Sequence, residues 1–575
     1  MYSAQIEVPA RGERRFLPND LVIDSWLKVE PYFEDLKKRT IGSLTELENW
    51  LLDSSELEAV FEEDMAWRYI KMNIDTTDQA LMDSFQFFVA EIEPKMAPYA
   101  DDFNRKLVDS EWLASLDQEK YRIHLRQIKK AIELYREENI PLLTQLQTDS
   151  QKFGTIAAKM SVTVDGEELT MQRASKYLRN TSREKREEVF QKMNLRRRED
   201  FDNLNELFSH LVGLRDEVAK NAGYDNFRDY KFDAMGRFDY TVQDCHNFHD
   251  SIQSEILPIV NGFAMERKAK LELDNLRPWD TEVDISGKPA LEPFKDEAEL
   301  IEKTVTCFHK VRPYFGDCME IMRQMGHLDL ESKAGKAPGG FNYPLYEIGV
   351  PFIYMNAVGS FQDVVTMVHE GGHAVHSFLS RNLELTAFKN LTSEVAELAS
   401  MSMELISMEH WDVFFENEDD LKRARKEQLT KIIGVLPWIA LIDKFQHWVY
   451  ENPKHTTEER TAKWLEMHGQ FSNDVVDWTG FEMFREQNWQ RQLHLFEVPF
   501  YYIEYGMAQL GAIAVWRNYK ADPEKALNQY TEALKLGYTK SIGEIYEAAG
   551  IKFDFSGEYV HELADFVKSE LAKMD

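Results

Sequence analysis

The stretch SFQDVVTMVHEGGHAVH, which spans residues 360–376, decides the fold of its surroundings. Its first residues, Ser360 and Asp363, can each bind a backbone amide as a capping box, which predicts a helix that begins after Ser360. His369 and His373 are four residues apart. They therefore project from one face of that helix, where both imidazoles can bind a single metal ion.

Three residues between these histidines add to the metal hypothesis. Glu370 points about 100° further round the helix axis, where it can act on a water molecule at the metal without being a ligand. Gly371 and Gly372 each cost roughly 1 kcal/mol relative to alanine inside a helix. Glycines at positions that disfavour the helix indicate a functional reason, and we expect them to leave space near the metal.

A third ligand is expected downstream, because zinc hydrolases use three protein ligands and keep a fourth position for water. The segment LTSEVAELASMSME, residues 391–404, offers Glu394, Glu397 and Glu404 on one face of a helix. The residues between them are small and apolar, which favours a buried helix over a solvated acidic face. Spacing alone leaves the choice among the three glutamates open.

Outside this region the sequence predicts a mainly α protein. Apolar residues recur at three- and four-residue spacing along most of the chain. Two stretches differ: residues 352–356 are short and apolar and predict a strand, and Asp165-Gly166 lies between alternating residues and predicts a β-hairpin. At this length more than one lobe is expected. We predict a largely helical lobe over 1–330 with the hairpin near 161–171, and a helical catalytic lobe over 331–575.

Composition narrows the function classes. Acidic residues outnumber basic ones by 100 to 68, giving a net charge of −32 that disfavours binding to nucleic acid or to an anionic membrane. The 3 cysteines are too few for a disulfide framework. The first residues lack the pattern of a secretory signal, and no run approaches the roughly 18 to 20 apolar residues of a membrane span. We therefore expect a soluble, cytoplasmic protein.

The sequence His369-Glu370-Gly371-Gly372-His373, followed by AELAS at 396–400, resembles the oligoendopeptidase F and thimet oligopeptidase family of zinc metallopeptidases. The predicted hairpin is similar to an element of the oligoendopeptidase F branch. The resemblance implies that His369, His373 and Glu397 bind one zinc ion and that Glu370 is the general base. It also implies an elongated multi-helix, zincin-like fold with a deep central channel, a small sheet beside the zinc helix, and 352–356 as an edge strand that pairs with the substrate.

A second segment, VPFYYIEYG at 498–506, resembles the tyrosine-rich segment of the same family. The resemblance implies that Tyr505 and His494 help to bind the transition state. Tyr502 and Tyr501 compete for the role of second tyrosine. Gly371 departs from the family pattern, because many relatives carry a bulky apolar residue there, and this bears on substrate preference.

The function implied is that of an endopeptidase that cleaves internal bonds of short unfolded oligopeptides. Two alternatives stay open. A carboxypeptidase or dipeptidyl carboxypeptidase would use the same helix and add a positive group that binds the substrate carboxylate. A non-catalytic peptide-binding protein would retain the site without turnover. The sequence predicts peptides as partners, and it does not predict the oligomeric state.

Overall fold

The computed structural model describes residues 7–333, 335–337 and 339–574. The described chain is mainly helical, with one two-stranded and one three-stranded sheet, and the mainly α prediction is confirmed. Residues 1–6, where no secretory signal was expected, lie outside the described part. Within that part, no helix combines the length and the apolar character needed to cross a membrane.

The chain divides into two compact units. The first unit comprises Met1–Glu133, Leu291–Arg425 and Gly511–Phe553, and the second comprises Leu134–Ala290, Lys426–Leu510 and Asp554–Asp575. Each unit is therefore assembled from three segments of the chain, whereas the lobes predicted from the sequence are contiguous. The division into lobes at residue 330 stays a prediction.

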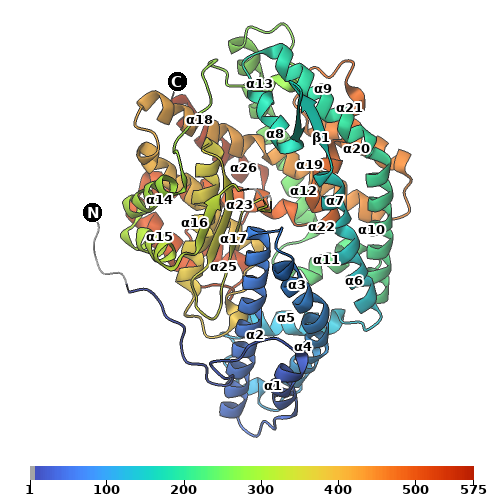
Figure 1. Cartoon of the computed structure of the whole chain (residues 1–575), viewed down its shortest axis with the longest axis vertical. Helices are drawn as coiled ribbons and strands as arrows, with labels where there is room; N and C mark the ends of the chain where they lie inside the picture. Colours follow the sequence, from blue (N-terminus) through green and yellow to red (C-terminus); the bar gives the residue numbers. More distant parts are fainter. Residues whose placement is uncertain (1–6, 334, 338, 575) are drawn as a thin grey trace. The chain divides into compact units, whose positions relative to one another are not determined.

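The helices of the first unit are α1 (Trp26–Lys38), α2 (Leu44–Ile74), α3 (Gln79–Phe87), α4 (Glu93–Val108), α5 (Arg122–Leu134), α14 (Glu297–Val311), α15 (Pro313–Met325), α16 (Phe361–Ser380), α17 (Ser393–Ser407), α24 (Pro523–Lys535) and α25 (Ile542–Ala548) (Figure 1). Helices α18 (Glu418–Gly434) and α23 (Tyr502–Ala521) each contain residues assigned to both units. Apolar side chains of α1 and α2, among them Phe33, Trp50 and Phe61, form a buried core. This core follows from the three- and four-residue spacing of these helices.

The three-stranded sheet also belongs to the first unit. It contains β3 (Leu328–Glu331), β4 (Phe341–Tyr343) and β5 (Phe352–Ala357) in the order β3-β5-β4. Strand β5 forms as predicted, but its position at the sheet edge was wrong, because it pairs with β3 in parallel and with β4 antiparallel. Strand β5 is therefore paired on both of its edges, and β4 forms one edge of the sheet.

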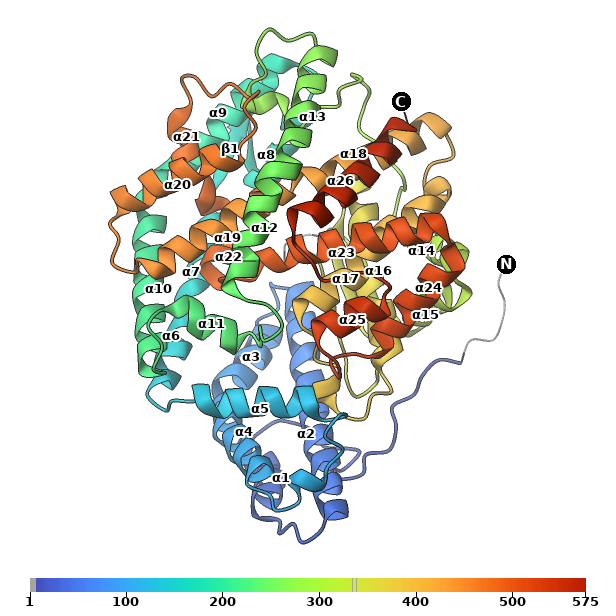
Figure 2. The ribbon, with the colours of Figure 1, turned by 180° about the vertical axis from the view of Figure 1, so that it is seen from behind.

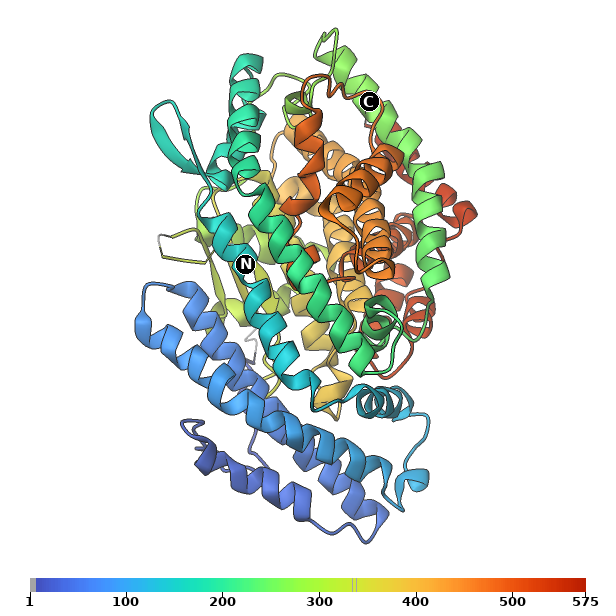
Figure 3. The ribbon, with the colours of Figure 1, turned by 90° about the vertical axis from the view of Figure 1, so that its right-hand side faces the viewer.

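The helices of the second unit are α6 (Asn139–Ser150), α7 (Lys152–Ala158), α8 (Met171–Ser175), α9 (Arg183–Glu199), α10 (Phe201–Asn221), α11 (Phe227–Ala234), α12 (Val242–Ser251), α13 (Leu257–Lys270), α19 (Leu436–Glu451), α20 (Thr457–Phe471), α21 (Glu482–Glu486), α22 (Leu493–Glu497) and α26 (Gly557–Ala572). The unit also contains the predicted hairpin, β1 (Ser161–Val164) and β2 (Glu167–Thr170), which is the cyan two-stranded ribbon in Figure 3. Asp165 and Gly166 both have positive φ, as a tight hairpin turn requires.

Candidate active site

Helix α16 carries the predicted metal-binding histidines. Its start is fixed as the sequence predicts: the Asp363 amide donates to Ser360 Oγ at 3.3 Å, and the Ser360 amide donates to Asp363 Oδ2 at 2.8 Å. The helix contacts β4 and β5, so it is held against the three-stranded sheet. The amide of Asn342 on β4 donates to the backbone oxygen of Glu370 at 3.3 Å.

The two glycines of α16 allow neighbouring helices to approach closely. A Cβ on Gly372 would lie 2.6 Å from Ser400 Cα and 2.9 Å from Met403 Cβ, both on α17. A Cβ on Gly371 would lie 2.5 Å from the ring of Phe308 on α14. The expectation that the glycines leave open space near the metal was therefore wrong, because packed side chains and backbone fill that space. The close approach brings α17 and its glutamates up to α16.

Three side chains of these two helices converge. Glu397 Oε2 lies 3.3 Å from His369 Nε2 and 3.8 Å from His373 Nε2. One donor atom from each of the three residues lies within 4.8 Å of the other two. Tetrahedral ligands at about 2.1 Å from a zinc ion lie about 3.4 Å apart. The donor types and their separations therefore fit a zinc ion held by two imidazoles and one carboxylate.

Neighbouring side chains hold two of these donors in place. Glu404 Oε1 lies 2.7 Å from His369 Nδ1, which directs the opposite ring nitrogen towards Glu397. The Ser400 hydroxyl donates to Glu397 Oε2 at 3.0 Å. Such contacts behind metal ligands fix the tautomer and orientation of the ligating ring. Of the three candidate glutamates, Glu397 faces both histidines and Glu404 contacts His369 from behind, while Glu394 lies outside the convergent set.

Burial and charge shift the pKa values in this cluster. Burial opposes ionisation of His369 and Glu397, but neighbouring groups outweigh it. Contacts with Glu397 and Glu404 raise the pKa of His369 well above its ordinary value, and contacts with the two histidines and the Ser400 hydroxyl lower the pKa of Glu397 to about 2. Burial lowers the pKa of His373 to about 4. Burial raises the pKa of Glu370 to about 7, opposed by the charge of His369 and supported by that of Glu397. A carboxylate with such a pKa can accept and return a proton near neutral pH.

The other predicted site residues lie together in the second unit. His494 is on α22, and its ring centroid lies 4.9 Å from that of Tyr502 and 5.8 Å from that of Tyr505. The Tyr501 ring lies 5.3 Å from that of Tyr505 and 6.0 Å from that of His494. Burial raises the pKa of Tyr502 to about 12, so its hydroxyl keeps its proton and can donate. The roles of His494, Tyr502 and Tyr505 in catalysis stay predictions.

A strained residue precedes these tyrosines. Phe500 has a φ of 69°, a left-handed conformation that costs a residue with a side chain roughly 1–2 kcal/mol. Its amide donates to Gln446 Oε1 at 2.7 Å, and its carbonyl accepts from Arg237. Arg237 also forms a buried ion pair with Glu504 at 2.7 Å. No sequence pattern indicates these contacts, because Arg237 and Gln446 are distant from Phe500 along the chain and belong to no recognisable motif.

Comparison with known proteins identifies the family. Residues 176–565 match the family described as peptidase family M3, and residues 21–135 match the peptidase M3 N-terminal domain. The chain belongs to peptidase family M3. A relative named oligoendopeptidase F homolog, from Borreliella burgdorferi, is 24% identical over 293 residues, or 50% of this chain and 48% of the relative. Oligopeptidase PepF of Bacillus subtilis is 22% identical over 326 residues, or 56% of this chain and 47% of the relative.

The chain spans about half the length of these curated relatives. Solved structures match the chain more completely. PZ peptidase A, solved with an inhibitor, superposes with a TM-score of 0.89 at 25% identity and covers 98% of this chain and 99% of its own. Oligoendopeptidase-F from Enterococcus faecium has a TM-score of 0.65 at 15% identity and covers 96% and 97%. The predicted resemblance to the oligoendopeptidase F branch is confirmed.

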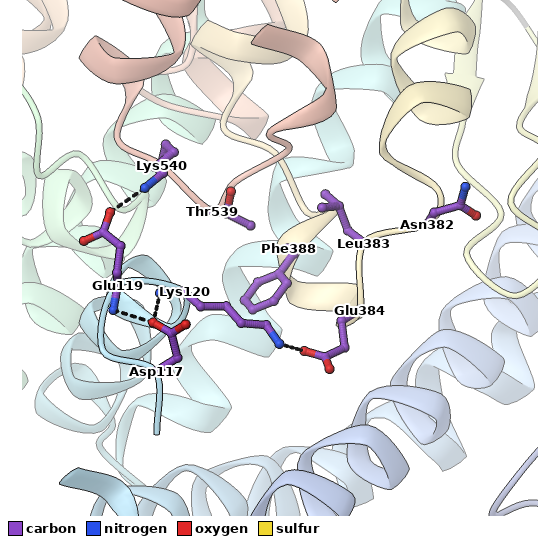
Figure 4. A pocket seen from close by; sticks show the side chains of 9 residues that line it. All are labelled: Asp117, Glu119, Lys120, Asn382, Leu383, Glu384, Phe388, Thr539 and Lys540. Carbon is purple, nitrogen blue, oxygen red and sulfur yellow. Dashed lines mark hydrogen bonds and ion pairs between the residues drawn. The ribbon is translucent and has the colours of Figure 1, made fainter. Parts of the chain in front are cut away.

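One cavity of the first unit lies away from the predicted chemistry. It has a volume of about 360 Å³, and Figure 4 shows the side chains that line it. Ion pairs join Lys120 to Glu384 and Lys540 to Glu119 across its wall. Its lining contains neither the convergent histidines nor Glu397. The paired charges are typical of a solvated surface hollow, and we assign it no role in the reaction.

Proposed function

We propose that this M3 peptidase is a zinc-dependent endopeptidase that cleaves internal bonds of short unfolded peptides. One observation carries the proposal: two imidazoles and one carboxylate converge at the spacing of zinc ligands, with Glu370 on the same helix and outside the ligand set. His369, His373 and Glu397 would hold one catalytic zinc ion. The donor set leaves a fourth position for water, as catalytic zinc sites do.

The zinc ligands and Glu370 would have different roles in the reaction. A bound zinc ion supplies Lewis acidity, which makes water a better nucleophile and polarises the carbonyl of the scissile bond. Glu370 takes the proton from the attacking water and passes it to the departing amine. Burial raises the pKa of Glu370 in the metal-free protein, which makes this carboxylate a stronger base than an exposed glutamate. Glu404 keeps His369 oriented throughout.

The substrate main chain is proposed to pair with β4 rather than with β5. Strand β4 ends the sheet and contacts α16, and Asn342 ties it to the backbone of Glu370. An extended peptide that adds to this edge gains main-chain hydrogen bonds without selecting particular side chains. The deep channel that the family resemblance implies would exclude folded proteins. Efficient digestion of a folded protein under native conditions would contradict this part of the proposal.

We also propose a role for the aromatic group of the second unit, which consists of His494, Tyr502 and Tyr505. It would stabilise charge on the substrate carbonyl. Hydroxyl donors from Tyr505 and Tyr502, together with His494, are suited to bind a developing oxyanion. We also propose that the protein acts in the cytoplasm, which the acidic composition and the lack of a disulfide framework support.

The test combines metal content with hydrolysis of an internally quenched peptide that is blocked at both ends. We expect chelator-sensitive cleavage at an internal bond that zinc restores. Bound metal without cleavage of the blocked peptide would favour the carboxypeptidase alternative. In that case, cleavage of a peptide with a free carboxyl end and not of its amidated form would establish it. Metal bound in the ligand site with no cleavage of either peptide would favour a non-catalytic peptide-binding protein.

A further inference from the structure

A second cluster of metal-ligand residues lies in the second unit, between α12 and α19. Cys245 and His249 are four residues apart on α12, and Asp443 and His447 are four residues apart on α19. Residues four apart lie on one helix face. The two helices contact each other, and Figures 1 and 2 show them side by side. Each helix therefore presents a pair of ligand-type side chains to the other.

These side chains meet at ligand distances. One donor atom each from Cys245, Asp443 and His447 lies within 4.8 Å of the other two. His447 Nε2 lies 3.1 Å from Asp443 Oδ2, and His249 Nε2 lies 2.8 Å from the same oxygen. All four residues are at most 2% exposed, with Cys245 and Asp443 at 0%. Thiolate, imidazole and carboxylate are the donor types that zinc accepts.

Some polar atoms of the cluster take no part in these hydrogen bonds. Asp443 Oδ1, His447 Nδ1 and His249 Nδ1 are buried and find no hydrogen-bond partner among the described residues. Aromatic rings surround the cluster: those of Phe232 and Phe500 lie 6.0 Å and 5.4 Å from the His447 ring. A carboxylate oxygen without a partner in such surroundings is costly. A bound divalent cation would remove that cost.

We propose that Cys245, Asp443 and His447 form a second zinc site, which joins α12 to α19. His249 binds the Asp443 carboxylate and orients it, as a contact behind a metal ligand does. These ligands are buried from solvent, so an ion bound here would hold the two helices together and could not meet a substrate.

The experiment removes the first site and measures the second. A variant that combines His369→Ala with His373→Ala is expected to retain about one zinc ion per chain, and addition of Cys245→Ser should lower this content at least tenfold. Cys318→Ser is the matched control, because Cys318 is equally buried and belongs to no convergent set among the described residues. Loss of zinc with the control and retention with Cys245→Ser would overturn the proposal.

Cobalt substitution gives a second measurement that needs no change in the cluster. The first site has no sulfur donor, so a thiolate-to-cobalt charge-transfer band in the near ultraviolet can arise only where a cysteine binds the metal. The double histidine variant, produced in cobalt-containing medium, should show this band, and Cys245→Ser should abolish it. A folded double histidine variant without the band and without bound metal would show that Asp443, His249 and His447 form only a hydrogen-bonded network. Neither readout depends on peptidase activity.

Discussion

The cluster on α16 and α17 and the cluster between α12 and α19 use the same helical spacing but differ in exposure. The side chains of His369 and His373 are each 20% exposed, whereas Asp443 and His447 are at most 2% exposed. An ion in the first cluster can meet water and substrate, while an ion in the second can only connect two helices. Four-residue spacing therefore indicates that a metal can bind, and exposure decides whether chemistry can follow.

The side chains next to the two clusters also differ in whether they can take part in a reaction. Glu370 is not a ligand of the first cluster, and its pKa is raised to about 7 by burial. The second cluster is bordered by aromatic rings and has His249 as a hydrogen-bond partner of Asp443. We therefore expect the catalytic centre at the first cluster, where Glu370 can act as a base without being a ligand.

The largest expected effect comes from removal of this base. Glu370→Gln should lower kcat by about 10²- to 10⁴-fold, because the variant cannot take a proton from water. Zinc content should stay unchanged, since Glu370 lies outside the ligand set. Steady-state hydrolysis and metal analysis of the same preparation measure both quantities. Glu111→Gln, at an exposed position of the same unit, is the control. Substantial residual hydrolysis by Glu370→Gln would exclude it as the base.

Substitution of the tyrosines, with the next largest expected effect, tests whether the aromatic group of the second unit takes part in the reaction. Tyr505→Phe should lower kcat by about 10²- to 10³-fold with little change in KM, because it removes a donor needed only in the transition state. Of Tyr502→Phe and Tyr501→Phe, one should behave in the same way and the other should remain near wild type. Unchanged kcat in all three variants would confine the chemistry to the first unit.

Gly372→Ala tests how α17 is brought to the first cluster. The added Cβ would lie 2.6 Å from Ser400 Cα, so α16 and α17 must separate. Overpacking of this kind costs about 1–3 kcal/mol of unfolding free energy, and it should also weaken zinc binding by moving Glu397 away from the histidines. Denaturant unfolding and zinc titration measure these losses. Gly213→Ala on α10 meets open space and should be neutral or slightly stabilising; equal losses in both variants would contradict the packing argument.

The sequence predicted those parts of the fold that depend on neighbouring residues. The capping box at Ser360 and the turn at Asp165-Gly166 are local signals, and both elements form where expected. The position of β5 depends on its pairing with β3 and β4, which no local pattern encodes. The role of Gly372 was misread for the same reason, because the atoms that its missing Cβ avoids belong to another helix.

The same limit explains the two clusters. His369 and His373 are close along the chain and were readily found, whereas the choice of Glu397 rested on family resemblance. The second cluster joins residues 194 positions apart, such as His249 and Asp443, and its two four-residue pairs were not recognised as halves of one site. A search for ligand-type pairs at four-residue spacing on separate predicted helices would have found both halves.

Glu404→Gln removes the negative charge behind His369 and keeps an amide oxygen that can still accept from Nδ1. The ring then loses the carboxylate that directs its Nε2 towards Glu397, and loss of such a partner typically lowers metal affinity 10- to 100-fold. Competition with a chromophoric chelator measures the zinc dissociation constant. Glu384→Gln, at an exposed ion pair of the same unit, should leave the constant unchanged. Wild-type affinity in Glu404→Gln would mean that the charge of Glu404 does not contribute to zinc binding by His369.

The smallest effect concerns the protons released when zinc binds to the first cluster. The pKa of Glu397 is lowered to about 2 and that of His373 to about 4, so neither carries a proton to release at neutral pH. The pKa of His369 is raised well above its ordinary value by contacts with Glu397 and Glu404 that outweigh burial. The metal-free protein therefore holds one imidazole proton that zinc must displace, and affinity should fall about tenfold for each pH unit of acidification near neutrality.

Calorimetric titration in buffers of different ionisation enthalpy counts this proton directly. The Cys245→Ser variant is the appropriate background, because only the first cluster then exchanges zinc. About one proton should be released per zinc bound, and Glu404→Gln should reduce that number, since it removes one of the two carboxylates that stabilise the imidazolium. A count near zero in the parent protein would mean that His369 is already neutral. The first cluster would then bind zinc without competition from a proton on His369.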